Sequence, residues 1–176
     1  MEILIISGLS GGGKSKAASF LEDMGFYIVD NMPASLILKF AEFCGSGSAR
    51  YDRVALVYDV RTADSFDEFL EVLDTLRQQE YDCKLLFLEA SISTIIKRYK
   101  ETRRRHPLES NTCSLEAAIR REMEILEPVR GLAQDAINTS NTINIGVLME
   151  SALYSLICPI NVFSMIFSLL VNNSYQ

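Results

Sequence analysis

The sequence predicts an α/β fold with a mostly parallel, five-stranded sheet flanked by helices. Short apolar runs that are typical of buried parallel strands alternate with amphipathic helical segments, and the first run leads directly into a glycine-rich loop. The chain has 176 residues, of which 48% are apolar and 23% are charged, so it is long enough for one domain with a sizeable core. We expect this domain to cover residues 1–150, followed by a divergent apolar tail over residues 151–176.

The N-terminal strand and its loop carry the strongest functional signal. Ile3–Ile6 is predicted to be a buried strand, and the next residues match G-x-x-x-x-G-K-[ST] at every fixed position; they are Gly8, Leu9, Ser10, Gly11, Gly12, Gly13, Lys14 and Ser15. Glycines let the backbone turn its N–H groups toward phosphate oxygens, and a helix opening near Lys14 adds its dipole. We expect Lys14 to reach the β- and γ-phosphates and the Ser15 hydroxyl to complete a Mg²⁺ shell.

The same loop also matches G-x-S-x-G, the strand-to-helix elbow that carries a hydrolase serine, here Ser10. That elbow normally follows several strands, whereas one predicted strand precedes Ser10, and a catalytic triad would depend on His106, the sole histidine. We therefore adopt the phosphate-loop interpretation. His106 itself is interpreted as a hinge or packing residue rather than a general base.

The remaining elements follow from periodicity and from turn residues. The other expected strands are Phe26–Asp30, Arg53–Asp59, Cys83–Leu88 and Gln134–Asn138. The first expected helix opens near Lys14 and is stopped by Gly25, and the second covers residues 33–43 with Pro33 in its first turn. The third is Ser65–Gln79, with a Ser65–Glu68 capping box. The fourth is marked by Ile92, Ile95, Ile96 and Tyr99, the fifth is marked by Leu115, Ile119, Met123 and Leu126 and is stopped by Pro128, and the last covers residues 145–157.

Ligands of open parallel sheets bind at the carboxyl ends of the strands. Asp59 ends an apolar strand, where a carboxylate can hold Mg²⁺ through water beside Ser15; the alternative is that it caps the following turn. Asp30 ends what we expect to be the neighbouring strand. It either orients or deprotonates an attacking water or hydroxyl, or caps the helix that starts near Pro33.

Residues 97–105 form a basic run with six cations and one carboxylate. We rank three interpretations of it. The first is a lid of the kind that mononucleotide kinases carry after the fourth strand, with Arg103, Arg104 and Arg105 closing over phosphates. The second is contact with RNA phosphates, and the third is a solvated helix face.

Four segments together closely resemble the RapZ/YvcJ family of bacterial nucleotide-binding proteins: Gly8–Ser15, Gly25–Pro33, Asp59–Thr62 and Glu101–Leu108. Ile137–Ser140 is similar to the family's Ile-Asp-Thr-Ser segment, with Asn138 in place of aspartate. The resemblance covers about residues 1–150. It implies a kinase-like P-loop NTPase domain that binds and slowly hydrolyses ATP and GTP with Mg²⁺. By the same resemblance, residues 8–15 would bind ATP, and GTP would be contacted by Asp59, Val60, Arg61 and Thr62.

The resemblance also implies an adapter role. Some members bind a regulatory small RNA and present it to an endoribonuclease, and members continue into a second domain of comparable size that is associated with RNA and sugar-phosphate binding. We expect residues 151–176 to be a stub of that domain. The alternatives are a small-molecule kinase that transfers the γ-phosphoryl group of ATP to a hydroxyl near Asp30, and an RNA adapter in which nucleotide only switches the conformation.

Composition restricts the other partners. A net charge of −6 argues against holding nucleic acid by overall attraction. Four scattered cysteines and the absence of a signal-peptide pattern lead us to expect reduced thiols and a cytoplasmic location. Residues 151–176 are uncharged, but Pro159, Asn161 and several serines make a poor membrane span, so we expect no membrane partner. A strand over Asn161–Val171 would expose an apolar edge, which leaves homo-oligomer formation open.

Overall fold

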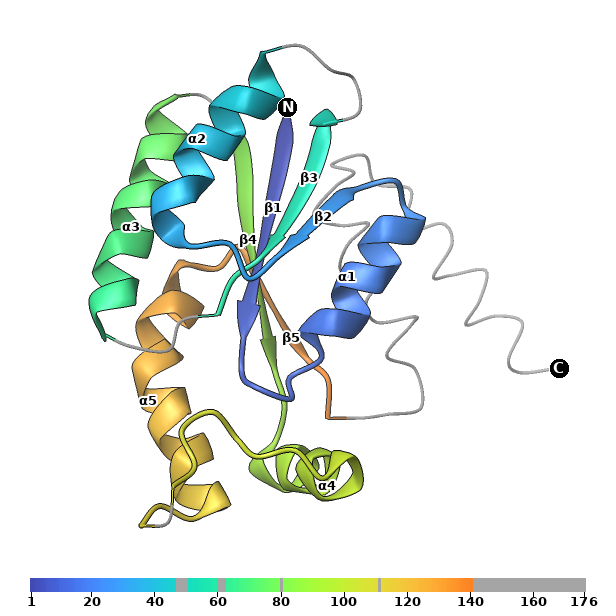
Figure 1. Cartoon of the computed structure of the whole chain (residues 1–176), viewed down its shortest axis with the longest axis vertical. Helices are drawn as coiled ribbons and strands as arrows, with labels where there is room; N and C mark the ends of the chain where they lie inside the picture. Colours follow the sequence, from blue (N-terminus) through green and yellow to red (C-terminus); the bar gives the residue numbers. More distant parts are fainter. Residues whose placement is uncertain (47–50, 60–62, 80, 111, 141–176) are drawn as a thin grey trace, which may run out of the picture.

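The computed structural model describes residues 1–46, 51–59, 63–79, 81–110 and 112–140 (Figure 1). The strands are β1 Glu2–Gly8, β2 Tyr27–Asp30, β3 Arg53–Val57, β4 Asp82–Glu89 and β5 Asp135–Asn138. The helices are α1 Lys14–Asp23, α2 Ala34–Gly45, α3 Ala63–Gln78, α4 Ile92–Thr102 and α5 Leu115–Leu132. All five expected strands are confirmed. The helix expected over residues 145–157 and the strand expected over Asn161–Val171 lie outside the described residues.

The strands form one parallel sheet in the order β2-β3-β1-β4-β5, as predicted for an α/β fold. β1 is central, with Ile6 opposite Val57 of β3 and opposite Leu86 of β4. One expectation was wrong in detail, because β3 and not β2 is the neighbour of β1 on that side. Asp30, at the end of β2, therefore lies one strand farther from the glycine-rich loop than we expected.

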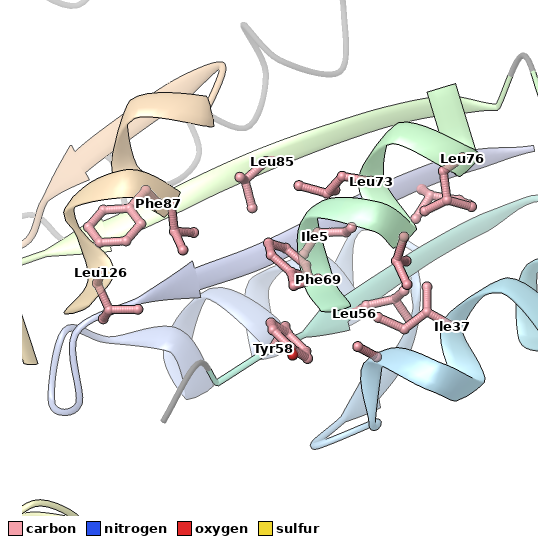
Figure 2. Close-up of a cluster of buried hydrophobic side chains, with 14 of the residues drawn as sticks. Ile5, Ile37, Leu56, Tyr58, Phe69, Leu73, Leu76, Leu85, Phe87 and Leu126 are labelled. Carbon is pink, nitrogen blue, oxygen red and sulfur yellow. The ribbon is translucent and has the colours of Figure 1, made fainter. Parts of the chain in front are cut away.

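Helices cover both faces of the sheet, so β1 is buried on both sides and reads as a continuous apolar run. Alternate residues of the strands point to opposite faces. Ile3, Ile5, Leu56, Leu85 and Phe87 pack with side chains of α2, α3 and α5, as Figure 2 shows for part of this core. Leu4, Ile6, Leu86 and Leu88 pack on the other face with Ala17 and Leu21 of α1. Figure 1 shows the two helical layers on either side of the sheet, with α4 beyond the strand ends.

The end of α1 agrees with the sequence prediction. Gly25 adopts φ 86°, its N–H donates to the Glu22 carbonyl at 2.9 Å, and the Phe26 N–H donates to the Leu21 carbonyl at 2.9 Å. This pair of bonds is the Schellman arrangement, which favours glycine in the left-handed position. The chain then enters β2 two residues later.

Two predicted helix boundaries were wrong. Pro128 lies inside α5 and does not stop it. A proline removes one helical hydrogen bond, but Leu126 and Val129 on either side of it are buried in the core, and this packing holds the last turn. α3 begins at Ala63, so Ser65 lies within the helix and is not its N-cap.

The start of α2 removes one of the two roles considered for Asp30. The N-cap of α2 is Pro33, and no hydrogen bond joins Asp30 to the described residues of this helix. Asp30 is exposed at the end of β2. The interpretation of Asp30 as a helix cap is therefore wrong. Its other role, orienting or deprotonating an attacking water or hydroxyl, stays a prediction.

Three of the four cysteines lie in the part of the chain that the structure describes. Cys44, Cys83 and Cys113 are free thiols, and burial raises the pKa of the Cys83 thiol to about 11. Cys158 lies outside the described residues. Among the helices that are described, none combines the length and the apolar character that a membrane span requires.

The burial of the core predicts that two phenylalanines contribute very differently to the free energy of unfolding. Phe69 is 0% exposed and its ring stacks on that of Tyr58 at 4.4 Å, whereas Phe43 of α2 is 61% exposed. Replacing Phe69 by alanine should lower the free energy of unfolding by about 3–5 kcal/mol, because a buried cavity remains. Phe43→Ala should change it by about 0.5 kcal/mol or less. Urea denaturation measures both, and equal losses would contradict the assignment of the core.

Candidate nucleotide-binding site

The phosphate loop connects the end of β1 to the start of α1 at the carboxyl edge of the sheet. Gly8 has φ 138°, and a Cβ atom there would overlap the backbone of Leu88 in β4. The next N–H, that of Leu9, donates to the Leu88 carbonyl at 2.9 Å. A side chain at residue 8 is therefore excluded by the close approach of β4, which explains the first glycine of the motif.

The other end of the loop forms the N-terminus of α1. Gly13 is the N-cap residue with φ 108°, a left-handed conformation that favours glycine. Its carbonyl accepts from the N–H groups of Lys16 at 3.0 Å and Ala17 at 3.1 Å, so the helix is regular from Lys14 onward. The first N–H groups of a helix lack intrahelical partners and attract anions. The loop thus ends in the anion-binding geometry that the motif predicts.

Lys14 and Asp59 lie in direct contact. The Lys14 Nζ atom donates to the carbonyls of Gly8 at 2.6 Å and Leu9 at 3.1 Å, and it is 3.0 Å from Asp59 Oδ1. The Lys14 side chain is 11% exposed and that of Asp59 is 28% exposed. Asp59 follows β3, the strand that pairs with β1, so the sheet brings the two residues together. Both were predicted as site residues, and the structure places them side by side.

The donor set near Lys14 fits Mg²⁺ rather than a metal held by protein ligands alone. Mg²⁺ usually takes one or two protein oxygens and completes its shell with phosphate oxygens and water. Asp59 is a carboxylate at the strand end, and Ser15 is an exposed residue in the first turn of α1. Within the described residues, no group of three or more His, Cys, Asp or Glu side chains could hold an ion by itself.

The predicted lid arginines do not touch the loop in this structure. Arg103 is the C-cap of α4 with φ 52°, and Arg103, Arg104 and Arg105 are all exposed. Among the described residues, none pairs with them in an ion pair or hydrogen bond. Val60, Arg61 and Thr62, which the resemblance assigns to GTP, lie outside the part of the chain that the structure describes.

Arg98 is a loop-contacting residue that the sequence analysis did not single out. Its guanidinium donates to the Gly11 carbonyl at 2.6 Å, to Thr139 Oγ1 at 3.1 Å and to the Thr139 carbonyl at 2.6 Å. Thr139 is buried, and its hydroxyl donates to the Gly12 carbonyl at 2.7 Å. Burial lowers the pKa of Arg98. The available signal was its place in the basic run between Ile95 and Tyr99, on the inner side of α4.

Glu122 is a second residue that sequence reasoning missed. Its carboxylate accepts from the Ser10 N–H at 2.9 Å and from the Ser10 hydroxyl at 2.6 Å, and it lies 3.2 Å from His106 Nε2. The residue is 6% exposed, whereas Met123, expected on the apolar stripe of α5, is 41% exposed. The stripe therefore passes through residue 122, and a carboxylate occupies an inward position of α5.

His106 is buried and packs against Tyr99, with ring centroids 5.3 Å apart, which agrees with the packing interpretation. Its Nδ1 atom accepts from the Leu108 N–H at 3.2 Å. Nε2 therefore carries the proton of the neutral ring and donates to Glu122. Burial, followed by the nearby Glu122 carboxylate, raises the pKa of Tyr99.

Comparisons of the sequence with known proteins show the family of the chain. The family model described as the RapZ-like N-terminal domain matches residues 1–156. A nucleotide-binding protein from Desulforamulus reducens is 46% identical over 142 residues, which are 81% of this chain and 47% of that protein. One from Finegoldia magna is 40% identical over 154 residues, which are 88% of this chain and 53% of that protein. The chain thus spans about half the length of these curated relatives.

Solved structures show the fold. A shikimate kinase from Bacteroides thetaiotaomicron matches with a TM-score of 0.55 at 14% identity, over 89% of this chain and 98% of that one. A gluconokinase from Sinorhizobium meliloti matches with a TM-score of 0.55 at 16% identity, over 99% and 98% of the two chains. The fold is therefore that of the P-loop kinases. Since the family model matches most of its length, the chain belongs to the family of RapZ-like N-terminal domains.

Proposed function

We propose that residues 1–150 are a nucleotide-binding domain that binds ATP or GTP with Mg²⁺ and hydrolyses it slowly. The observation that carries this proposal is the position of Lys14, whose ammonium lies at the base of the phosphate loop within 3.0 Å of Asp59. Such an ammonium can exchange carbonyl acceptors of the loop for phosphate oxygens without leaving its place. The relatives named as nucleotide-binding proteins support the same conclusion.

In this proposal each site residue has a separate task. Lys14 and the loop N–H groups bind the β- and γ-phosphates, and the oxygens of Ser15 and Asp59 hold the metal ion. Mg²⁺, when bound, neutralises charge on the phosphates. Arg103 and Arg104 are placed on an exposed segment after α4 from which they can close over the nucleotide. Asp30 is the candidate for orienting the attacking water.

A small-molecule kinase is the second candidate function. A hollow of about 250 Å³ lies beside Leu9 at the carboxyl ends of β1 and β4, lined partly by Glu89 and Arg130. It offers polar groups on an apolar wall, as acceptor sites often do. Asp30, near which we expected the acceptor, is not among the residues that line this hollow. The structural neighbours named as kinases share the fold. ADP formation that requires an added hydroxyl acceptor would favour the kinase, whereas equal ADP formation with water alone favours the hydrolase.

RNA and ribonuclease partners, which the family resemblance implies, are a further proposal. If this chain contacts RNA through Arg103, Arg104 and Arg105, its RNA affinity should fall steeply with salt and with removal of these charges. RNA affinity that resists both changes would contradict a phosphate contact at this segment.

Lys14→Ala should abolish most nucleotide binding. Loss of a charge-assisted hydrogen-bond partner costs about 2 kcal/mol or more, which is roughly a 30-fold loss of affinity. Lys16→Ala is the matched control, because Lys16 is an exposed lysine of the same helix. Titration with fluorescent ATP and GTP analogues measures both variants. Equal affinity of Lys14→Ala and the wild type would contradict the proposed site.

Asp59→Asn should remove most of the gain in nucleotide affinity that Mg²⁺ provides, because the amide replaces the metal-supporting carboxylate. Without Mg²⁺ its affinity should equal or exceed that of the wild type, since Lys14 loses a competing anion. Asp52→Asn is the control, an exposed aspartate just before β3, whereas Asp59 follows that strand. Affinities in Mg²⁺ and in EDTA decide the matter, and an unchanged Mg²⁺ effect in Asp59→Asn would count against the metal role.

A further inference from the structure

The buried carboxylate of Glu122 has an unusual set of partners for a charged group in a protein interior. Its residue is 6% exposed, and in the described part of the chain neither lysine nor arginine pairs with it. Buried charges need hydrogen bonds or counter-charges. Glu122 obtains them from Ser10 of the phosphate loop and from His106. Removing the Glu122 carboxylate therefore leaves the donors of Ser10 and of His106 without this acceptor.

Ser10 is held through both of its donors. Its N–H donates to Oε2 of Glu122 and its hydroxyl donates to Oε1, so these two bonds to α5 fix the orientation of Ser10. The following carbonyls of the loop, those of Gly11 and Gly12, accept from Arg98 and Thr139. The outer side of the loop is thus fixed by residues that are remote in sequence, and Glu122 supplies the contact at Ser10.

His106 connects the same carboxylate to the segment that carries the arginines. It directly follows Arg105, and its ring is fixed from both sides, by the Leu108 N–H at Nδ1 and by Glu122 at Nε2. The backbone N–H of His106 also donates to Glu109 at 3.2 Å. A movement of Glu122 would therefore displace the point at which the exposed arginines join the folded part of the protein.

We propose that Glu122 is a positioning residue that couples the phosphate loop to the segment Arg103–Arg105. It sets Ser10 on one side and His106 on the other, so that nucleotide in the loop changes the exposure of the arginines. The inference rests on the proposed function, because it requires nucleotide at the loop. Glu122 itself would not contact the reacting atoms.

Trypsin provides the readout, since it cleaves after exposed arginines, and mass spectrometry reports cleavage at Arg103–Arg105. In the wild type, saturating ATP or GTP with Mg²⁺ should slow this cleavage several-fold. In Glu122→Ala, cleavage without nucleotide should be faster, and the nucleotide should no longer slow it even at saturation. Nucleotide affinity should fall by about tenfold, because Ser10 loses a charged acceptor.

Glu122→Gln separates hydrogen bonding from charge. Its carbonyl oxygen can accept from the Ser10 N–H and from His106, as Oε2 does, and its amide can donate to the Ser10 hydroxyl. We expect this variant to keep the nucleotide-dependent protection. Glu124→Ala, an exposed glutamate of the same helix, is the control for lost charge and should behave as the wild type. If Glu122→Ala does not fold, Ser10→Ala removes one of the two bonds and should weaken the protection.

The outcomes separate this inference from the proposed function. A folded wild-type chain that binds no nucleotide contradicts the proposed function, and basal cleavage of Glu122→Ala still tests the link to His106. Wild-type binding with full protection in both Glu122→Ala and Ser10→Ala would overturn the coupling. Loss of protection in Glu122→Gln to the extent seen in Glu122→Ala would overturn it as well, because the hydrogen bonds would then not carry the effect.

Discussion

The ammonium of Lys14 donates hydrogen bonds to two carbonyl oxygens of its own loop, at 2.6 Å and 3.1 Å, and it lies 3.0 Å from the carboxylate of Asp59. These contacts join the end of β1, the start of α1 and the end of β3 at one cation. Charge-assisted hydrogen bonds are stronger than neutral ones, and they strengthen further where water is excluded. The residue that we assign to phosphate binding therefore also helps to maintain the shape of the loop.

The sheet makes this convergence possible. Because all the strands are parallel, their carboxyl ends meet at one edge, and β1 lies between β3 and β4. The backbone of Leu88 in β4 leaves no room for a side chain at Gly8. Later parts of the chain then complete the surroundings of the loop, with Arg98 from α4, Glu122 from α5 and Thr139 after β5. The loop motif is local in sequence, but its conformation depends on most of the domain.

Much of the fold could be predicted because the burial of each strand is visible in its pattern of apolar residues. β1 and β3 are covered on both faces and appear as uninterrupted apolar runs, and Gly25 ends α1 by a local mechanism. The position of Asp30 relative to the loop was not predictable in this way. Strand order depends on how the helices pack across the sheet. Nothing in the sequence of β2 indicates that β3 lies between β2 and β1.

Residues of the candidate site could be predicted where a sequence motif carries the chemistry. They could not be predicted where the rotation of a helix about its axis decides which side chain faces the loop. Lys14, Ser15 and Asp59 follow from the loop and from a strand end. Glu122 was missed because Met123 is the apolar residue, and a rotation of one residue about the α5 axis decides which of them faces the loop. Pro128 was misjudged for a related reason, since the burial of its neighbours outweighs the lost hydrogen bond.

Calorimetric competition is the most direct test of whether the loop recognises phosphate groups. The wild-type chain would be titrated with ATP and Mg²⁺ alone, then in the presence of pyrophosphate, and then in the presence of adenosine. We expect one site per chain, with pyrophosphate displacing ATP and adenosine leaving the binding of ATP unchanged. Binding that adenosine blocks while pyrophosphate does not, or a folded chain that gives no binding heat, would contradict it.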